Sequence, residues 1–177
     1  MEHVEDLLKK TESIKTPNEV QHIVVHLGTN DVSRHSEDAG QVIIEYTIGL
    51  NTIREKFPKA EISLVSVPPR KGRSEGVAIR NEVSLTLNRY IERLAASDSA
   101  LHYVDTYPML TDANGSPIKK FYDKRDPTGV HFNQEGKNLL KKVFLQAMNV
   151  DENAVDSKRK QEFATPPSTE KSSKVKR

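Results

Sequence analysis

The sequence predicts an α/β fold in which about three parallel strands are covered by helices on both faces. Three observations support this prediction. Short apolar runs alternate with longer stretches of helical periodicity, each apolar run ends in a turn-forming segment, and a chain of 177 residues suits one domain of ordinary size. Strands that are separated by helices of this length are typical of right-handed crossovers and a parallel sheet.

The first elements are a short helix and a strand. A helix is expected over residues 2–13, because its apolar side chains share one side. A strand is expected over residues 21–27, after Pro17 and before the turn-forming segment Gly28-Thr29-Asn30-Asp31. Polar residues that directly follow a strand of a parallel sheet lie at the edge where such folds place their binding sites.

Two long helices and two more strands follow. The first helix ends before Pro58, and its apolar face comprises Ile43, Tyr46, Leu50, Ile53 and Phe57. A strand over residues 61–67 is ended by Pro68 and Pro69. The second helix has an apolar face formed by Ile79, Val83, Leu87, Ile91 and Leu94. Residues 100–107 are expected to form the third strand.

The last part of the domain is irregular before it becomes helical. A turn at residues 112–115 leads to the segment Asp126-Pro127-Thr128-Gly129-Val130-His131. Asn133 is a suitable N-cap for a final helix with the apolar residues Leu139, Leu140, Val143, Phe144 and Ala147. Residues 1–150 are therefore predicted to form a single domain.

Residues 151–177 are predicted to be a disordered basic tail. They lack periodic apolar positions, and from Ser157 onward they carry seven lysines and arginines against two acidic residues. The whole chain has a formal charge of +2, so the remainder is mildly acidic. Such a tail could act as a nuclear import signal, contact a polyanion, or be a solvated terminus without a specific partner.

Composition limits the compartment and the chemistry. The chain has no cysteine, which excludes disulfides, thiolate metal sites and a cysteine nucleophile. A charged start and the lack of a long apolar run argue against a secretory signal and a membrane span. His22 and His26 would stand about 13 Å apart on a strand, too far for one metal ion. We expect an intracellular protein, cytoplasmic or nuclear, with no cofactor and no metal.

Three segments, in this order, resemble the SGNH hydrolase superfamily, also called GDSL esterases and lipases. They are Gly28-Thr29-Asn30-Asp31, Val65-Ser66-Val67-Pro68-Pro69-Arg70 and the run from Gly129 to Gly136, and the resemblance covers about residues 2–149. It implies a three-layer, flavodoxin-like parallel sheet and the hydrolysis of a small ester. It also implies that Asn30, in the loop after Gly28, donates to an oxyanion and that His131 acts as the base.

Two departures from the family concern its catalytic groups. The family's Gly-Asp-Ser nucleophile segment is absent before Gly28, and Ser13 follows a predicted helix instead of a strand. The acid that usually lies three residues before the histidine is replaced by Thr128. Asp126 is five residues upstream of His131 and reaches the ring only if the loop bends back, against the restriction of Pro127. We therefore expect an inactive domain unless another segment supplies the nucleophile.

The same resemblance leaves the strand at residues 21–27 without a neighbour, because the family places its first strand there. An exposed edge invites pairing with another segment or chain. The sequence is then either a truncated gene product, or the protein dimerises or associates to cover that edge.

An alternative function is a non-catalytic binding module that contacts RNA, DNA or a protein. The basic loop Arg70, Lys71 and Arg73 follows the second strand, at the same edge as Asn30 and His131. Its charges would suit an acidic ester or a phosphate backbone, or would be solvated. Together with the tail, this loop carries the nucleic-acid prediction.

Overall fold

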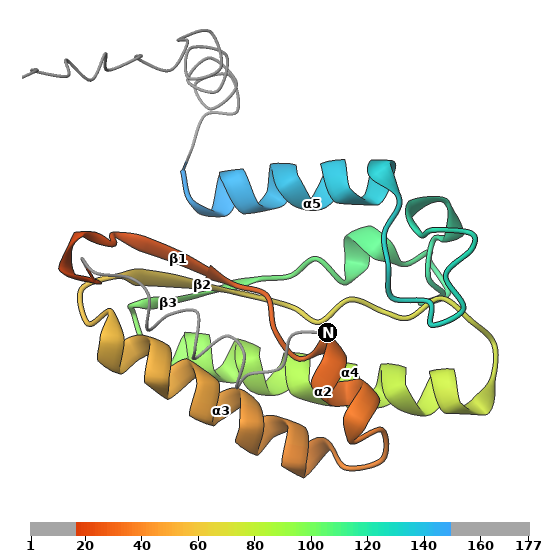
Figure 1. Ribbon diagram of the computed structural model, residues 1–177, viewed down its shortest axis with the longest axis horizontal. Helices are drawn as coiled ribbons and strands as arrows, with labels where there is room; N and C mark the ends of the chain where they lie inside the picture. Colours follow the sequence, from red (N-terminus) through yellow and green to blue (C-terminus); the bar gives the residue numbers. More distant parts are fainter. Residues whose placement is uncertain (1–16, 150–177) are drawn as a thin grey trace, which may run out of the picture.

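The computed structural model describes residues 17–149, and three parallel strands form its sheet in the order β1-β2-β3 (Figure 1). β1 is His22–Val25, β2 is Glu61–Val65 and β3 is Leu101–Val104. Ile62 in the central strand is in register with Ile23 on one side and Leu101 on the other. The predicted α/β class is confirmed. Each strand is shorter than predicted because the chain leaves the ladder before its apolar run ends.

Helices cover both faces of this sheet, which gives three layers. α3 (Ala39–Lys56) and α4 (Glu75–Ala96) lie on one face, and α5 (Gln134–Ala147) lies on the other (Figure 1). Short helices fill the connections: η1 (Pro17–Glu19), α2 (Thr29–Arg34), η2 (Pro108–Leu110) and η3 (Lys119–Phe121). The helix predicted at residues 2–13 and the tail at residues 151–177 lie outside the described residues. No helix within residues 17–149 is long and apolar enough to cross a membrane.

The main core lies between the sheet and the helices α3 and α4. The helical positions that the periodicity predicts are buried there, and they include Tyr46, Leu50, Ile53, Val83, Leu87 and Ile91. From the sheet, Ile62 and Leu64 of β2 complete this core. Removing these side chains from water is the main force that fixes the two helices on the sheet.

Polar side chains determine where the helices start. Asp38 accepts a hydrogen bond from the Gln41 N–H at 2.9 Å before α3, and Asn133 accepts one from the Gly136 N–H at 3.1 Å before α5. These bonds satisfy N–H groups that have no partner inside a helix. The predicted cap at Asn133 is confirmed, and it fixes the start of the helix that directly follows His131.

Candidate active site

The turn after β1 is the first part of the candidate site. Gly28 has φ 104°, and a methyl group at its Cα would lie 2.8 Å from Leu87 and 2.9 Å from Val67. Glycine is therefore required here by both backbone conformation and space. The Val32 N–H donates to the Gly28 carbonyl at 2.9 Å, so the segment predicted as a turn continues into helix α2. Asn30 consequently lies in the first turn of α2.

The chain beyond β2 reaches this turn because two asparagines of α4 hold its backbone. Asn88 accepts from the Val67 N–H at 2.7 Å and donates to the Val67 carbonyl at 3.0 Å. In the same way, Asn81 accepts from the Arg70 N–H at 2.8 Å and donates to the Arg70 carbonyl at 3.2 Å. The Ser66 N–H still donates to the Val104 carbonyl of β3, and beyond it Val67 and Arg70 are held by these asparagine side chains instead of by a neighbouring strand. Residues 66–71 are called the β2 extension below. Sequence reasoning missed both asparagines, although Asn81, Ser84 and Asn88 follow helical spacing as a polar stripe beside the apolar one.

Arg70 joins the end of this extension to helix α2. Its guanidinium donates to the Thr29 carbonyl and, at 2.7 Å, to the Ser33 hydroxyl. Its side chain is buried, and burial, reinforced by the charge of Arg80, lowers the pKa of Arg70 to about 10, while Asp126 acts in the opposite direction. Arg70 is thus not an exposed charge of the basic loop but a link between the ends of β1 and β2.

The His131 loop is attached to the next residue of the same extension. The Lys71 N–H donates to the Gly129 carbonyl at 2.9 Å, and the Lys71 ammonium donates to the Asp123 carbonyl at 2.6 Å. A methyl group at Gly129, where φ is 72°, would lie 2.0 Å from the Lys71 carbonyl oxygen. The close approach therefore depends on glycine. Consecutive residues, Arg70 and Lys71, hold the Asn30 helix and the His131 loop at one end of the sheet.

Asp126 contacts the ring of His131. The sequence alone did not determine whether the loop bends back far enough for this contact. Its Oδ2 lies 3.1 Å from the His131 Nδ1 and accepts hydrogen bonds from the backbone N–H groups of Val130 and His131, both at 2.8 Å. The loop bends back despite Pro127 because these bonds and the left-handed conformation of Gly129 close it. The His131 side chain is 68% exposed, whereas that of Asp126 is 6% exposed. The imidazole therefore has one nitrogen on a carboxylate and presents its other edge to solvent.

Thr128, which occupies the position of the family's acid, supports Asp126. Its N–H and hydroxyl donate to the Asp126 Oδ1 at 2.9 and 2.6 Å. Burial by itself would raise the pKa of Asp126, but the hydrogen bonds from Thr128 and His131 outweigh it and hold this pKa below its ordinary value. The carboxylate is therefore ionised at neutral pH, as a group that orients and stabilises an imidazolium must be.

The structure does not bring all the predicted site residues into contact. The segments of Asn30 and His131 meet through two neighbouring residues: Arg70 donates to the Thr29 carbonyl, and the Lys71 N–H donates to the Gly129 carbonyl. Among residues 17–149, no serine hydroxyl is hydrogen-bonded to the His131 ring, and Ser13 lies outside the described residues. The same range contains no group of three His, Cys, Asp or Glu residues that could hold a metal ion. His22 instead contacts Ser63, and His26 packs against Phe144.

The profile of the GDSL-like lipase/acylhydrolase family matches residues 4–139. The chain belongs to this family. The match includes the Gly28–Asn30 segment, the extension of β2 and the Asp126–His131 pair. No curated protein sequence matches the chain.

Solved structures with this fold have low sequence identity to the chain. A Streptococcus pneumonia protein provisionally assigned as a platelet activating factor has 23% identity and a TM-score of 0.66, over 83% of this chain and 68% of its own. A GDSL-like lipase from Bacteroides thetaiotaomicron has 20% identity and a TM-score of 0.64, over 84% and 71%. A family 3 carbohydrate esterase from Talaromyces cellulolyticus has 17% identity and a TM-score of 0.60, over 83% of this chain and 66% of its own. The family's sheet-and-helix architecture is thus confirmed, and the chain spans about two thirds of each of these proteins.

Proposed function

We propose that the Asp126–His131 pair is the acid–base part of an acyl-ester hydrolase site in this GDSL-like domain. The observation that carries the proposal is the 3.1 Å contact between Asp126 Oδ2 and His131 Nδ1, on an imidazole that is otherwise exposed. In ester hydrolysis a histidine takes the proton of the attacking hydroxyl and then gives it to the leaving alcohol. A carboxylate on the other ring nitrogen fixes the tautomer and stabilises the imidazolium.

Asn30 is the proposed oxyanion donor of the same site. Its amide belongs to the first turn of α2, which Arg70 fixes by hydrogen bonds to Thr29 and Ser33. A donor held in advance can stabilise the negative charge that develops on an ester carbonyl, and such a contact is worth about 3 kcal/mol of barrier.

The 177-residue chain is proposed to be inactive by itself. A histidine base needs a hydroxyl to deprotonate, and none of the described serines is hydrogen-bonded to His131. A serine from another segment or chain would complete the site.

The test of this function has two parts, on the full chain. Hydrolysis of a short-chain acyl ester should be the same for the wild type and His131→Ala, whereas robust turnover that this substitution abolishes would contradict the proposed inactivity. The pair itself is tested without a nucleophile, by acylation of His131 with diethylpyrocarbonate. Asp126→Asn should slow this acylation, because the activating carboxylate is lost, while Asp112→Asn should not. Equal rates in all three proteins would refute the acid–base assignment.

The binding-module alternative has a smaller basis than the sequence indicated. Arg70 is buried and donates to Thr29 and Ser33, so it offers no charge to a polyanion. Lys71 and Arg73 line a pocket beside the His131 loop. The tail lies outside the described residues, so contact with RNA, DNA or a protein through it stays a prediction.

A further inference from the structure

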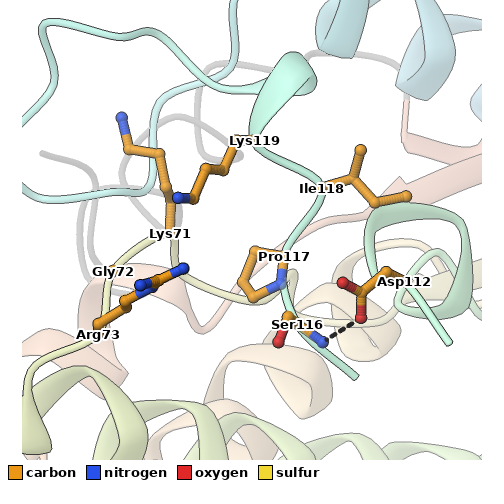
Figure 2. A pocket seen from close by; sticks show the side chains of 8 residues that line it. All are labelled: Lys71, Gly72, Arg73, Asp112, Ser116, Pro117, Ile118 and Lys119. Carbon is orange, nitrogen blue, oxygen red and sulfur yellow. Dashed lines mark hydrogen bonds between the residues drawn. The ribbon is translucent and has the colours of Figure 1, made fainter. Parts of the chain in front are cut away.

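A pocket of about 410 Å³ lies between the end of the β2 extension and the segment before η3 (Figure 2). One wall is Lys71, Gly72 and Arg73, and the other runs from Asp112 to Lys119. Its volume is in the range of sites that take small molecules. Neither Asp126 nor His131 lines this pocket.

The second wall has a fixed shape because its backbone is hydrogen-bonded to itself. The Asp112 carboxylate accepts from the Asn114 and Ser116 N–H groups, both at 2.9 Å, and Figure 2 shows the second of these bonds. The Ile118 N–H donates to the Leu110 carbonyl at 2.8 Å. The pocket is therefore formed before any ligand binds.

The pocket has an excess of positive charge. Lys71, Arg73 and Lys119 line it together with a single acidic residue, Asp112, whose Oδ1 is occupied by the backbone N–H groups of its own turn. The Lys71 ammonium donates to a neutral carbonyl, that of Asp123, which leaves its charge uncompensated.

The other two cations have no protein partner of their own in the part of the chain that the structure describes. Within residues 17–149, no hydrogen bond or ion pair is made by the side chain of Arg73 or of Lys119, whereas the side chain of the neighbouring Lys120 pairs with Glu135 at 3.2 Å. Figure 2 shows the Lys119 side chain reaching from its own wall toward the backbone of Lys71, with the Arg73 guanidinium on the same side of the hollow. Uncompensated cations that face one concave space favour an anionic ligand.

The pocket lies beside the loop that carries His131. Lys71, which lines it, is hydrogen-bonded through its backbone to Gly129, two residues before His131. The absence of space for even a methyl group at Gly129 shows how closely the two segments approach. A ligand in the pocket would therefore lie next to the histidine loop.

We propose that this pocket binds an anionic group, of the phosphate class, on the ligand that the His131 site receives. Arg73 and Lys119 are the specificity-determining residues, and they supply charged N–H donors to the phosphate oxygens. That the rest of this ligand is an ester rests on the proposed hydrolase function. The binding of its anionic group does not, because binding needs no turnover.

The test is an NMR titration of the full chain with inorganic phosphate at low ionic strength. Saturable shifts are expected at the backbone amides of Gly72, Lys119 and Gly129. The double variant Arg73→Gln/Lys119→Gln should weaken the affinity roughly tenfold or more, since charge-assisted hydrogen bonds are lost. The control Lys124→Gln/Arg125→Gln removes the same charge from two exposed residues outside the pocket and should leave the affinity unchanged.

The proposal is overturned if no saturable shift occurs, or if the pocket variant and the control variant bind alike. A second arm separates two sources of the phosphate group. Glycerol 3-phosphate that competes with inorganic phosphate assigns a soluble ester, whereas pocket-dependent sedimentation with vesicles of phosphatidylcholine and phosphatidic acid assigns a lipid headgroup. Phosphate binding, with His131 acylated by diethylpyrocarbonate at the same rate in the wild type and in Asp126→Asn, supports this proposal and refutes the acid–base assignment. Acylation that Asp126→Asn slows, without any phosphate binding, supports the acid–base assignment and refutes this proposal.

Discussion

Asp126 organises the histidine loop at the scale of single residues, because both its oxygens accept hydrogen bonds. Oδ1 receives the two bonds from Thr128, and Oδ2 receives two backbone N–H groups and faces the His131 ring. The sequence identified His131 and named Asp126 as a candidate, but it could not determine whether the loop bends back. That outcome depends on several short hydrogen bonds and on a left-handed glycine, none of which has a periodic signature.

Asp126 should make the stability of the protein dependent on pH. Its native pKa lies below the ordinary value of about 3.9, so its contribution is present above about pH 4 and is lost as the pH falls toward the native pKa. Asp126→Asn should therefore lower the free energy of unfolding at pH 7 by about 2 kcal/mol. Urea unfolding should show this difference shrinking below pH 4. A difference that stays constant from pH 7 to pH 3 would contradict the assignment.

Gly129 should be far less tolerant of a side chain than Gly115, although both have positive φ. The values are 72° and 74°, but a methyl group at Gly115 meets nothing within 4 Å, whereas one at Gly129 meets the Lys71 carbonyl. Gly115→Ala should cost about 1 kcal/mol of unfolding free energy, from backbone strain alone. Gly129→Ala should cost about 3 kcal/mol, because the loop must also move away. Equal costs, measured by urea unfolding, would show that the two segments are not in close contact.

At the scale of elements, the periodic pattern predicted the helices well and the ends of the strands poorly. The apolar faces of α3 and α4 are buried as expected, because one repeat specifies both the helix and its core side. Strand β2 is shorter than predicted, since the backbone of Val67 and of Arg70 bonds to asparagine side chains of α4 instead of to a neighbouring strand. Helix α2 was missed because its six residues are too few for a periodic pattern.

The asparagine contacts of α4 lead to a prediction for this extension. Asn88→Ala should lower the free energy of unfolding by about 2 kcal/mol, since it leaves the buried N–H and carbonyl of Val67 without partners. Hydrogen exchange at the Val67 amide should accelerate as well. Asn51→Ala, on the exposed face of α3, is the control and should change stability by less than about 0.5 kcal/mol. An Asn88 variant that behaves like this control would show that the extension is held by other contacts.

At the scale of the whole molecule, the sheet brings together residues that are about a hundred positions apart. Asn30 follows β1, Arg70 and Lys71 follow β2, and His131 precedes α5, as the order of the three family segments predicts. β1 is an edge of the sheet within the described residues, so association through it stays a prediction. The pocket beside the histidine loop could not be predicted, because it depends on how two irregular segments pack.

The charge distribution predicts how a nucleic acid would bind, if it does so through the tail. Residues 157–177 hold the excess of lysine and arginine, while the rest of the chain is mildly acidic. Affinity for single-stranded RNA should fall steeply with salt and should be lost when these residues are deleted. Affinity that survives the deletion would assign the contact to the body of the protein.

The central claim is that Asp126 holds His131 so that its Nε2 can act as a base. The most direct measurement is the tautomer of the His131 ring, from long-range proton–nitrogen NMR correlations at a pH where the ring is neutral. We predict a proton on Nδ1 and a lone pair on Nε2 in the wild type, and a shift toward the Nε2-protonated form in Asp126→Asn. A wild-type ring protonated on Nε2, with the same tautomer in the variant, would contradict the account.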